Sequence, residues 1–207
     1  MKIIKSNYDE SYFNTWLERL PLEKMFNEDK INLINSIKTS GKLLEIGCGR
    51  GILLNELKKD YSIQGTDIST SAIKEASKLL KKYLLKVSNI ENSNIRGKYE
   101  IILAFDVLEH LKNPEKAIVK IKKALNKEGV FIFSVPNNYG LFGKLMTSFF
   151  NYTDKTHIST YKRETWIKIM RDYGFKVEIY NQHLFGISKF DFMKHFAFNL
   201  VIVAFNP

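Results

Sequence analysis

Cysteine is almost missing from this chain, whose 207 residues include only Cys48. A lone cysteine excludes an intramolecular disulfide and any zinc site built from several cysteines. Cys48 stands between two glycines, where a small side chain suffices. We therefore interpret it as a packing residue of a tight turn and not as a reactive thiol.

Long apolar runs are also absent. A membrane-spanning helix needs about 18 or more consecutive apolar residues, and the longest apolar stretch, 196–205, is short and interrupted by Asn199. The residues that follow Met1 lack the apolar core of a secretory signal peptide. We expect a cytoplasmic protein, and the apolar segment 139–150 is the candidate for peripheral membrane association.

Acidic residues are fewer than basic ones: the chain has 22 aspartates and glutamates and 32 lysines and arginines, and its net charge is +10. The lysines are spread along predicted helices, and no arginine-rich block or basic tail stands out. This distribution favours a solvated lysine-rich surface over a nucleic-acid site. Repeats and low-complexity tracts are missing as well. The length fits a single domain, 1–207, that is large enough for a real core.

What is present centres on residues 43–51, Leu-Leu-Glu-Ile-Gly-Cys-Gly-Arg-Gly. An apolar run ends in an acid, and three glycines follow at alternate positions before a helical pattern starts at Ile52. Bare glycine backbone admits a ligand that side chains would block, and a helix N-terminus attracts negative charge. The third glycine comes one residue earlier than in the dinucleotide fingerprint G-x-G-x-x-G, which disfavours a nicotinamide enzyme.

Strand and helix patterns alternate along the chain and predict a parallel sheet covered by helices on both faces. Ligands of such sheets lie beyond the carboxyl ends of the strands. Strands are expected near residues 43–46, 63–68, 84–87, 100–105 and 130–135, and helices at 25–37, 52–59, 72–82, 115–125 and 163–173. We divide the domain into an N-terminal helical cap (1–40), a cofactor-binding half (41–137) and a substrate-side half (138–207).

Asp67 ends the second predicted strand. A carboxylate at this position can accept hydrogen bonds from both ribose hydroxyls of an adenosine group. The alternative interpretation is an Asx turn or a helix cap. Both NAD and S-adenosylmethionine would satisfy the glycine turn and Asp67 together.

Four segments in order resemble the class I S-adenosylmethionine-dependent methyltransferases: 43–51, Gly65–Ser69, Phe105–Leu111 and Leu125–Phe131. The resemblance covers roughly residues 40–180. It implies a Rossmann-like, seven-stranded, mostly parallel sheet with helices on both faces and an antiparallel last strand. The predicted strands 175–180 and 199–205 match the last two strands of that fold. It also implies S-adenosyl-L-methionine as the cofactor.

The resemblance also implies roles for individual residues around that cofactor. The glycine turn would pass under the methionine part, Glu45 would anchor the turn near the ammonium group, and Asp67 would bind the ribose. Ile68 would pack on the adenine, and Asn89 and Ile90 would border the adenine edge. The cofactor-binding residues implied in this way are Glu45, Gly47, Cys48, Gly49, Asp67, Ile68, Asn89, Ile90 and Phe105.

Methyl transfer from a sulfonium ion is an in-line displacement that depends mainly on positioning, so few catalytic residues are expected. An oxygen acceptor also needs a group that takes its proton. His157 and His110 are the candidates, and packing is the alternative for each. Asp106 and Glu109 have the spacing of a capping box for the following helix. The sequence shows no metal cluster, although Glu109 could contribute to one.

The acceptor is predicted from an apolar helical face in a stretch where the alternation pauses: Phe142, Leu145, Met146, Phe149 and Phe150. This face can be a lid over a hydrophobic acceptor, a membrane contact or an ordinary core helix. Together with the D-x-L-E-H motif (106–110) and Thr156-His157, it resembles the quinone-pathway O-methyltransferases. We therefore expect a small, hydrophobic acceptor methylated at oxygen, with Phe142, Met146 and Phe149 as substrate contacts.

Two alternatives remain. The basic charge favours an RNA methyltransferase, whereas an N-P-P-Y type signature is missing after the fourth strand and paired cysteines are impossible. RNA is therefore the less favoured partner. The second alternative is a cofactor-binding subunit that has lost catalysis and supports a partner protein.

Overall fold

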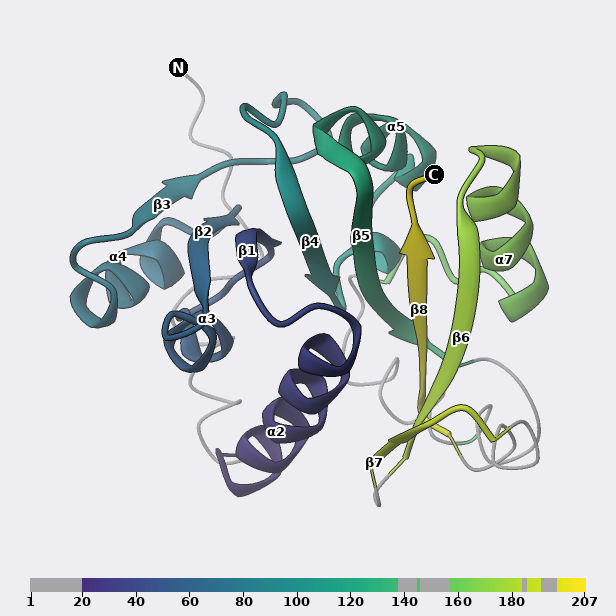
Figure 1. The fold of residues 1–207 in the computed structure, drawn as a ribbon, viewed down its shortest axis with the longest axis horizontal. Helices are drawn as coiled ribbons and strands as arrows, with labels where there is room; N and C mark the ends of the chain where they lie inside the picture. Colours follow the sequence, from purple (N-terminus) through teal and green to yellow (C-terminus); the bar gives the residue numbers. More distant parts are fainter. Residues whose placement is uncertain (1–19, 138–144, 146–156, 184–185, 191–196) are drawn as a thin grey trace. The chain divides into compact units, whose positions relative to one another are not determined.

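The computed structural model describes residues 20–137, 145, 157–183, 186–190 and 197–207 (Figure 1). The described chain forms two compact units, Met1–Asn89 and Ile90–Pro207, and each is considered by itself. The predicted cap is thus described only from Leu20 onward. The predicted substrate contacts Phe142, Met146 and Phe149 lie outside the described residues.

The first unit alternates helices and strands as the sequence predicts. Its elements are α2 (Leu20–Ile37), β1 (Gly41–Ile46), α3 (Ile52–Leu57), β2 (Tyr61–Asp67), α4 (Thr70–Leu79) and β3 (Leu84–Val87). Strand β2 pairs in parallel with β1 on one side and with β3 on the other. Glu45 lies opposite Gly65, so the glycine turn after β1 and Asp67 at the end of β2 emerge at the same edge.

Apolar side chains account for the inner strands of this unit. Leu43, Leu44 and Ile46 of β1 are buried, and Leu54 of α3 is fully enclosed. Parallel strands that are covered on both faces carry such continuous apolar runs. By contrast, most of β3 is exposed, and among the described residues of this unit β3 pairs only with β2.

The second unit contains most of the strands. Its elements are β4 (Tyr99–Phe105), the 3-10 helix η1 (Leu108–His110), α5 (Pro114–Ala124), β5 (Leu125–Pro136), α7 (Arg163–Asp172), β6 (Lys176–His183), β7 (Gly186–Ser188) and β8 (Asn199–Phe205). Strands β4 and β5 are parallel, and β8 runs antiparallel between β5 and β6. Figure 1 shows α5 and α7 in this unit, with α7 alongside β6.

These elements confirm the predicted α/β Rossmann-like fold with parallel strands and an antiparallel last strand, with one difference in strand number. The described residues contain eight strands and not seven. The additional strand, β7, has only three residues and pairs with the end of β6. Three residues are too few to show the alternating pattern by which a strand is recognised in a sequence.

Helix ends follow the predicted signals. The Ser69 side chain caps α4 by accepting a hydrogen bond from the N–H of Ala72, at 3.3 Å. Asn113 caps α5 through the N–H of Lys116, and Pro114 fills the first position, where its missing N–H costs nothing. Gly174, with φ +73°, closes α7 in a left-handed conformation that suits glycine.

The predicted capping box at Asp106 and Glu109 is wrong. Only the short η1 follows, and within the described chain its cap, Val107, makes no side-chain bond to the backbone. The Asp106 carboxylate instead accepts hydrogen bonds from Ser134 Oγ at 2.7 Å and from Asn199 Nδ2 at 3.0 Å. Asp106 has φ +55° and therefore turns the chain sharply, so its side chain reaches β5 and β8 instead of the next helix.

Among the helices that the structure describes, none has the length and apolar character that crossing a membrane requires.

Candidate functional site

The glycine turn after β1 is built from backbone hydrogen bonds. The N–H groups of Gly47 and Cys48 both donate to the carbonyl of Thr66, at 2.7 and 3.0 Å, and this ties the turn to β2. Gly47, Gly49 and Gly51 all have positive φ, between 50° and 77°. Other L-residues rarely adopt such a conformation, which explains the alternate glycines. Gly51 then caps α3, and the turn leads directly to a helix N-terminus.

Asp67 locks this turn in place. One carboxylate oxygen accepts the N–H of Gly49 at 2.9 Å, and the other accepts the N–H of Ser69 at 2.7 Å. Burial raises the pKa of the Asp67 carboxyl, and the backbone hydrogen bonds oppose this rise. The bond to Ser69 is the Asx-type contact that the sequence left open as an alternative. A carboxylate has about four lone-pair sites, so the two bonds leave room for a ribose, and that role stays a prediction.

Close packing joins Cys48 to the neighbouring strand. A Cβ added at Gly65 would lie 2.7 Å from Leu54 Cδ1 and 2.8 Å from both Cys48 Sγ and Leu85 Cδ2. Burial, together with the charges of Glu45 and Asp67, raises the pKa of the Cys48 thiol. The thiolate is the reactive form of cysteine. A buried thiol of raised pKa therefore suits the packing role expected from the sequence.

Glu45 is the unusual residue of the first unit. Its side chain is buried, and its Oε2 atom has no hydrogen-bond partner within the described part of the chain. Burial raises its pKa to about 8, although the nearby charge of Lys30 lowers it in part. A buried acid with an unused oxygen is costly unless a donor or a cation satisfies it. The geometry is therefore suited to a ligand that brings a positive group, as predicted for the cofactor's ammonium.

The other predicted cofactor residues are divided between the two units. Ile68 follows Asp67 and is exposed, so its side chain is available for a flat ligand group. Asn89 is partly exposed and ends the first unit. Ile90 and Phe105 are buried in the second unit. The structure leaves their contacts with a cofactor as predictions.

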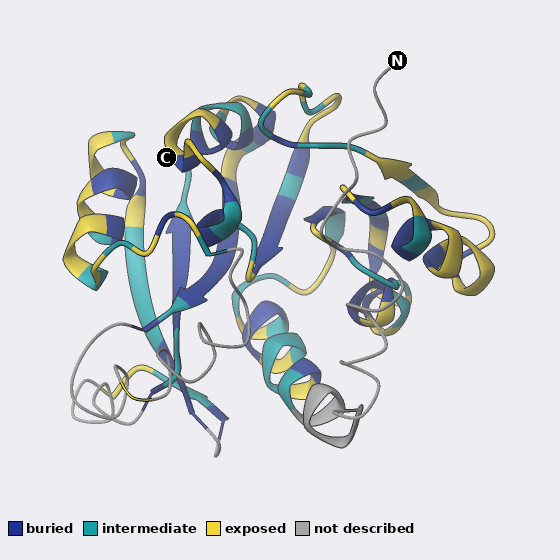
Figure 2. Ribbon diagram, turned by 180° about the vertical axis from the view of Figure 1, so that it is seen from behind, coloured by how far each residue is buried: buried dark blue, intermediate teal, exposed yellow. Residues whose placement is uncertain are grey.

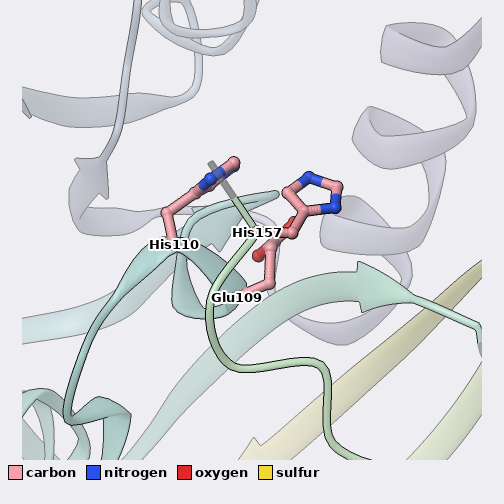
Figure 3. A group of neighbouring side chains, drawn as sticks. All are labelled: Glu109, His110 and His157. Atoms are coloured by element: carbon pink, nitrogen blue, oxygen red, sulfur yellow. The ribbon is translucent and has the colours of Figure 1, made fainter. Parts of the chain in front are cut away.

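A second group of candidate site residues lies in the second unit (Figure 3). His110 and His157, the two predicted catalytic candidates, have ring centroids 4.7 Å apart. Glu109 lies with them, and one ligand atom from each of the three residues falls within 4.8 Å of the others. Both histidines are partly exposed, whereas Glu109 is buried. Figure 3 shows His110 and Glu109 rising from η1, while His157 comes from a separate segment.

Backbone bonds hold these two segments together. The N–H groups of Ile158 and Ser159 both donate to the carbonyl of Glu109, at 2.8 Å each. The Ser159 hydroxyl donates to the carbonyl of Leu111 at 2.7 Å, and Ser159 is buried. The segment that carries His157 is thus fixed against η1. Preorganised side chains of this kind are what proton transfer or metal binding requires.

This group has two chemical uses. A histidine side chain can accept a proton in general base catalysis, and a neighbouring carboxylate can orient it. Two histidines and one carboxylate are also a common ligand set for a catalytic divalent cation. Sequence reasoning singled out both histidines separately and missed their contact. The only available signal was the similarity of both segments to one family, since nothing in their spacing predicts that they meet.

A family model described as a methyltransferase domain matches residues 15–179, which is more than half of the chain. The chain belongs to this methyltransferase domain family. The methyltransferase is also similar to a ubiquinone biosynthesis O-methyltransferase from Rickettsia conorii, with 27% identity over 124 residues. That match covers 58% of this chain and only 41% of the Rickettsia protein, so the chain spans less than half of that relative.

Solved structures share the fold of the methyltransferase. One is an S-adenosylmethionine-dependent methyltransferase from Thermotoga maritima, described as a possible histamine N-methyltransferase. It has a TM-score of 0.78 and 16% identity, and the match covers 96% of this chain and 98% of that one. Another is magnesium protoporphyrin IX methyltransferase from Synechocystis with bound S-adenosylhomocysteine. Its TM-score is 0.72 at 17% identity, over 99% and 98% of the two chains.

The family match confirms the predicted methyltransferase domain, and the solved structures confirm the Rossmann-like fold predicted for it. They do not bear on the acceptor. The predicted lid, 139–150, is described only at Leu145, whose helical backbone carries a side chain that is 65% exposed.

Proposed function

We propose that the protein transfers the methyl group of S-adenosylmethionine to an oxygen atom of a small, hydrophobic acceptor. The observation that carries this proposal is the group formed by Glu109, His110 and His157. A hydroxyl acceptor must lose its proton as the new carbon–oxygen bond forms, and this group can take or withdraw that proton. The name of the Rickettsia relative, a ubiquinone biosynthesis O-methyltransferase, supports the same chemistry.

In this proposal His157 is the general base, and Glu109 and His110 keep it in position. His157 is partly exposed and is held by the backbone clamp on Glu109, so its ring is accessible and oriented. The proton of the acceptor hydroxyl passes to a ring nitrogen of His157 while the acceptor oxygen attacks the methyl carbon. The methyl–sulfur bond breaks at the same time, and S-adenosylhomocysteine leaves.

The same three residues would hold a divalent cation, because their ligand atoms lie close enough to share one. A cation at that place lowers the pKa of a bound hydroxyl and so favours the same oxygen chemistry. Chelation separates the two versions of the proposal. If His157 acts as the base alone, a chelator leaves turnover unchanged; if a cation takes part, activity is lost and added Mg²⁺ or Zn²⁺ restores it.

The decisive experiment offers methyl-labelled S-adenosylmethionine with matched acceptors that differ only in their nucleophile, such as hydrophobic phenols and the corresponding anilines. Labelled ether product from the phenols, identified by mass spectrometry, is expected. Transfer to the anilines alone would contradict an oxygen acceptor. Labelled RNA, or turnover only after a second protein is added, would favour the RNA methyltransferase or the silent partner subunit.

A further inference from the structure

A second surface of the first unit, away from the glycine turn in sequence, combines exposed apolar side chains with lysines. It is formed by the end of α4, the following turn and β3, and we call residues 74–87 the α4–β3 surface. Figure 2 shows exposed residues along both α4 and β3. Ala72, Ile73 and Ala76 bury the inner face of α4, and this leaves its other face in solvent.

Large apolar side chains are unusually concentrated here. The described residues include nine exposed large apolar side chains, and four of them lie between residues 79 and 87. These four are Leu79 (43% exposed), Tyr83 (37%), Leu84 (63%) and Val87 (42%). Single exposed apolar residues are ordinary, whereas four within nine residues indicate a segment suited to an apolar partner.

The same surface is strongly basic. Residues 74–87 contain five lysines, Lys74, Lys78, Lys81, Lys82 and Lys86, and one acid, Glu75. Glu75 forms an ion pair with Lys78 at 2.7 Å. Within the described chain, the other four lysines have no acidic partner at ion-pair distance. Five positive charges against one negative charge leave a local net charge of +4.

We propose that the α4–β3 surface docks on an anionic lipid membrane. Lysines interleaved with leucine, valine and tyrosine are the composition of interfacial segments, in which apolar side chains enter the acyl boundary and lysines contact lipid phosphates. Long lysine side chains can reach the headgroups while their stems cover apolar surface. This inference does not depend on the acceptor proposed above.

Two other occupants fit the surface less well. A second copy of the chain would bring the same +4 charge against itself, and lysines on an edge strand such as β3 oppose strand pairing. RNA would match the charge, but base recognition uses aromatic stacking and hydrogen bonds. The exposed apolar residues of this surface are mainly aliphatic, and Tyr83 is the one aromatic residue among them.

The test is flotation of the purified full chain with vesicles of phosphatidylcholine alone or phosphatidylcholine mixed with phosphatidylglycerol. Binding only to the mixed vesicles, decreasing as salt increases, is expected. Lys81→Glu/Lys82→Glu should reduce the fraction bound at least about tenfold. Leu79→Ser/Leu84→Ser should reduce binding also at low salt, where charge attraction is strongest.

The matched controls are Lys116→Glu/Lys123→Glu on α5, which makes the same charge change on exposed residues, and Phe190→Ser, which removes another exposed apolar group. Both controls should bind as the unchanged protein does. The proposal would be overturned if the protein did not bind the mixed vesicles. It would also be overturned if the controls lost as much vesicle binding as the α4–β3 variants, or if both α4–β3 variants still bound the vesicles. The proposal would also be overturned if the protein did not bind vesicles but bound RNA in a salt-dependent way, and if Lys81→Glu/Lys82→Glu abolished that RNA binding. Circular dichroism confirms that each variant is folded.

Discussion

The glycine turn and the histidine group are assembled in different ways. The turn is held against β2 by the carbonyl of Thr66 and the carboxylate of Asp67, which accept hydrogen bonds from its backbone N–H groups, and its positive-φ conformations belong to glycines. The histidine group instead joins η1 to a segment far along the chain, through two N–H groups that share the carbonyl of Glu109.

The largest effect is expected at Glu45, on the pH dependence of the free energy of unfolding. Because burial raises the folded-state pKa to about 8, the folded protein holds a proton that the unfolded chain releases near pH 4.5. The contribution of Glu45 to the free energy of unfolding should therefore be highest below pH 4.5 and decrease as pH rises toward 8. The decrease should be on the order of a few kcal/mol.

Urea unfolding of the protein and of Glu45→Gln, at several pH values across this range, measures the effect. Glutamine has nearly the same shape and no proton to lose, so the variant should lack the part of the slope that Glu45 contributes. Equal slopes for the two proteins would show that the Glu45 carboxyl titrates in its ordinary range.

The next largest effect is expected at His157, on the turnover number. Replacing His157 by alanine removes the proposed base and should lower the turnover number by about a hundredfold or more. Affinity for S-adenosylmethionine should stay the same, because His157 is not among the residues predicted to bind the cofactor. Calorimetry and initial rates measure the two quantities. A variant with full activity would remove His157 from the mechanism.

Gly65 tests how tightly the first unit is packed. Gly65→Ala would place a methyl group within 2.8 Å of three side chains, Leu54, Cys48 and Leu85. Such overpacking costs about 1–3 kcal/mol of stability, and the displaced Cys48 should also weaken cofactor binding. Ser62→Ala, at an exposed position of the same strand, is the control and should leave the unfolding midpoint unchanged. A Gly65→Ala variant as stable as the control would contradict the close packing.

Asp67 has the smallest of these expected effects. Asp67→Ala removes the hydrogen bond from Gly49 of the glycine turn and the one from Ser69, together with the predicted ribose contact. Affinity for S-adenosylmethionine should decrease by at least about tenfold. Asp67→Asn retains the shape and one acceptor oxygen and should lose less. Unchanged calorimetric affinity of the alanine variant would refute the cofactor position.

Local sequence signals predicted the first unit well. The apolar run of β1, the positive-φ glycines and Ser69 as a cap act within a few residues, so their physical consequences can be read in order. Local signals failed where a side chain has a distant partner. Asp106 resembles a cap in sequence, yet it bonds Ser134 and Asn199 from two other strands.

The histidine group was predicted only as separate residues for the same reason. His157 approaches His110 because two N–H groups find the carbonyl of Glu109, and a pairing of that kind leaves no pattern in the sequence. The unused oxygen of Glu45 was likewise not predictable, since it depends on which donors the folded chain fails to supply within the described residues. Strand β7 is too short to leave a pattern at all.

The central claim is that the glycine turn binds the cofactor and the histidine group acts on the acceptor. Its most direct test is the rate of methyl transfer by Asp67→Ala and by His157→Ala, measured with increasing S-adenosylmethionine up to saturation. We predict that saturation restores Asp67→Ala to nearly the rate of the unchanged protein and leaves His157→Ala about a hundredfold slow. Restoration of His157→Ala at saturation, or failure to restore Asp67→Ala, would contradict this division of roles.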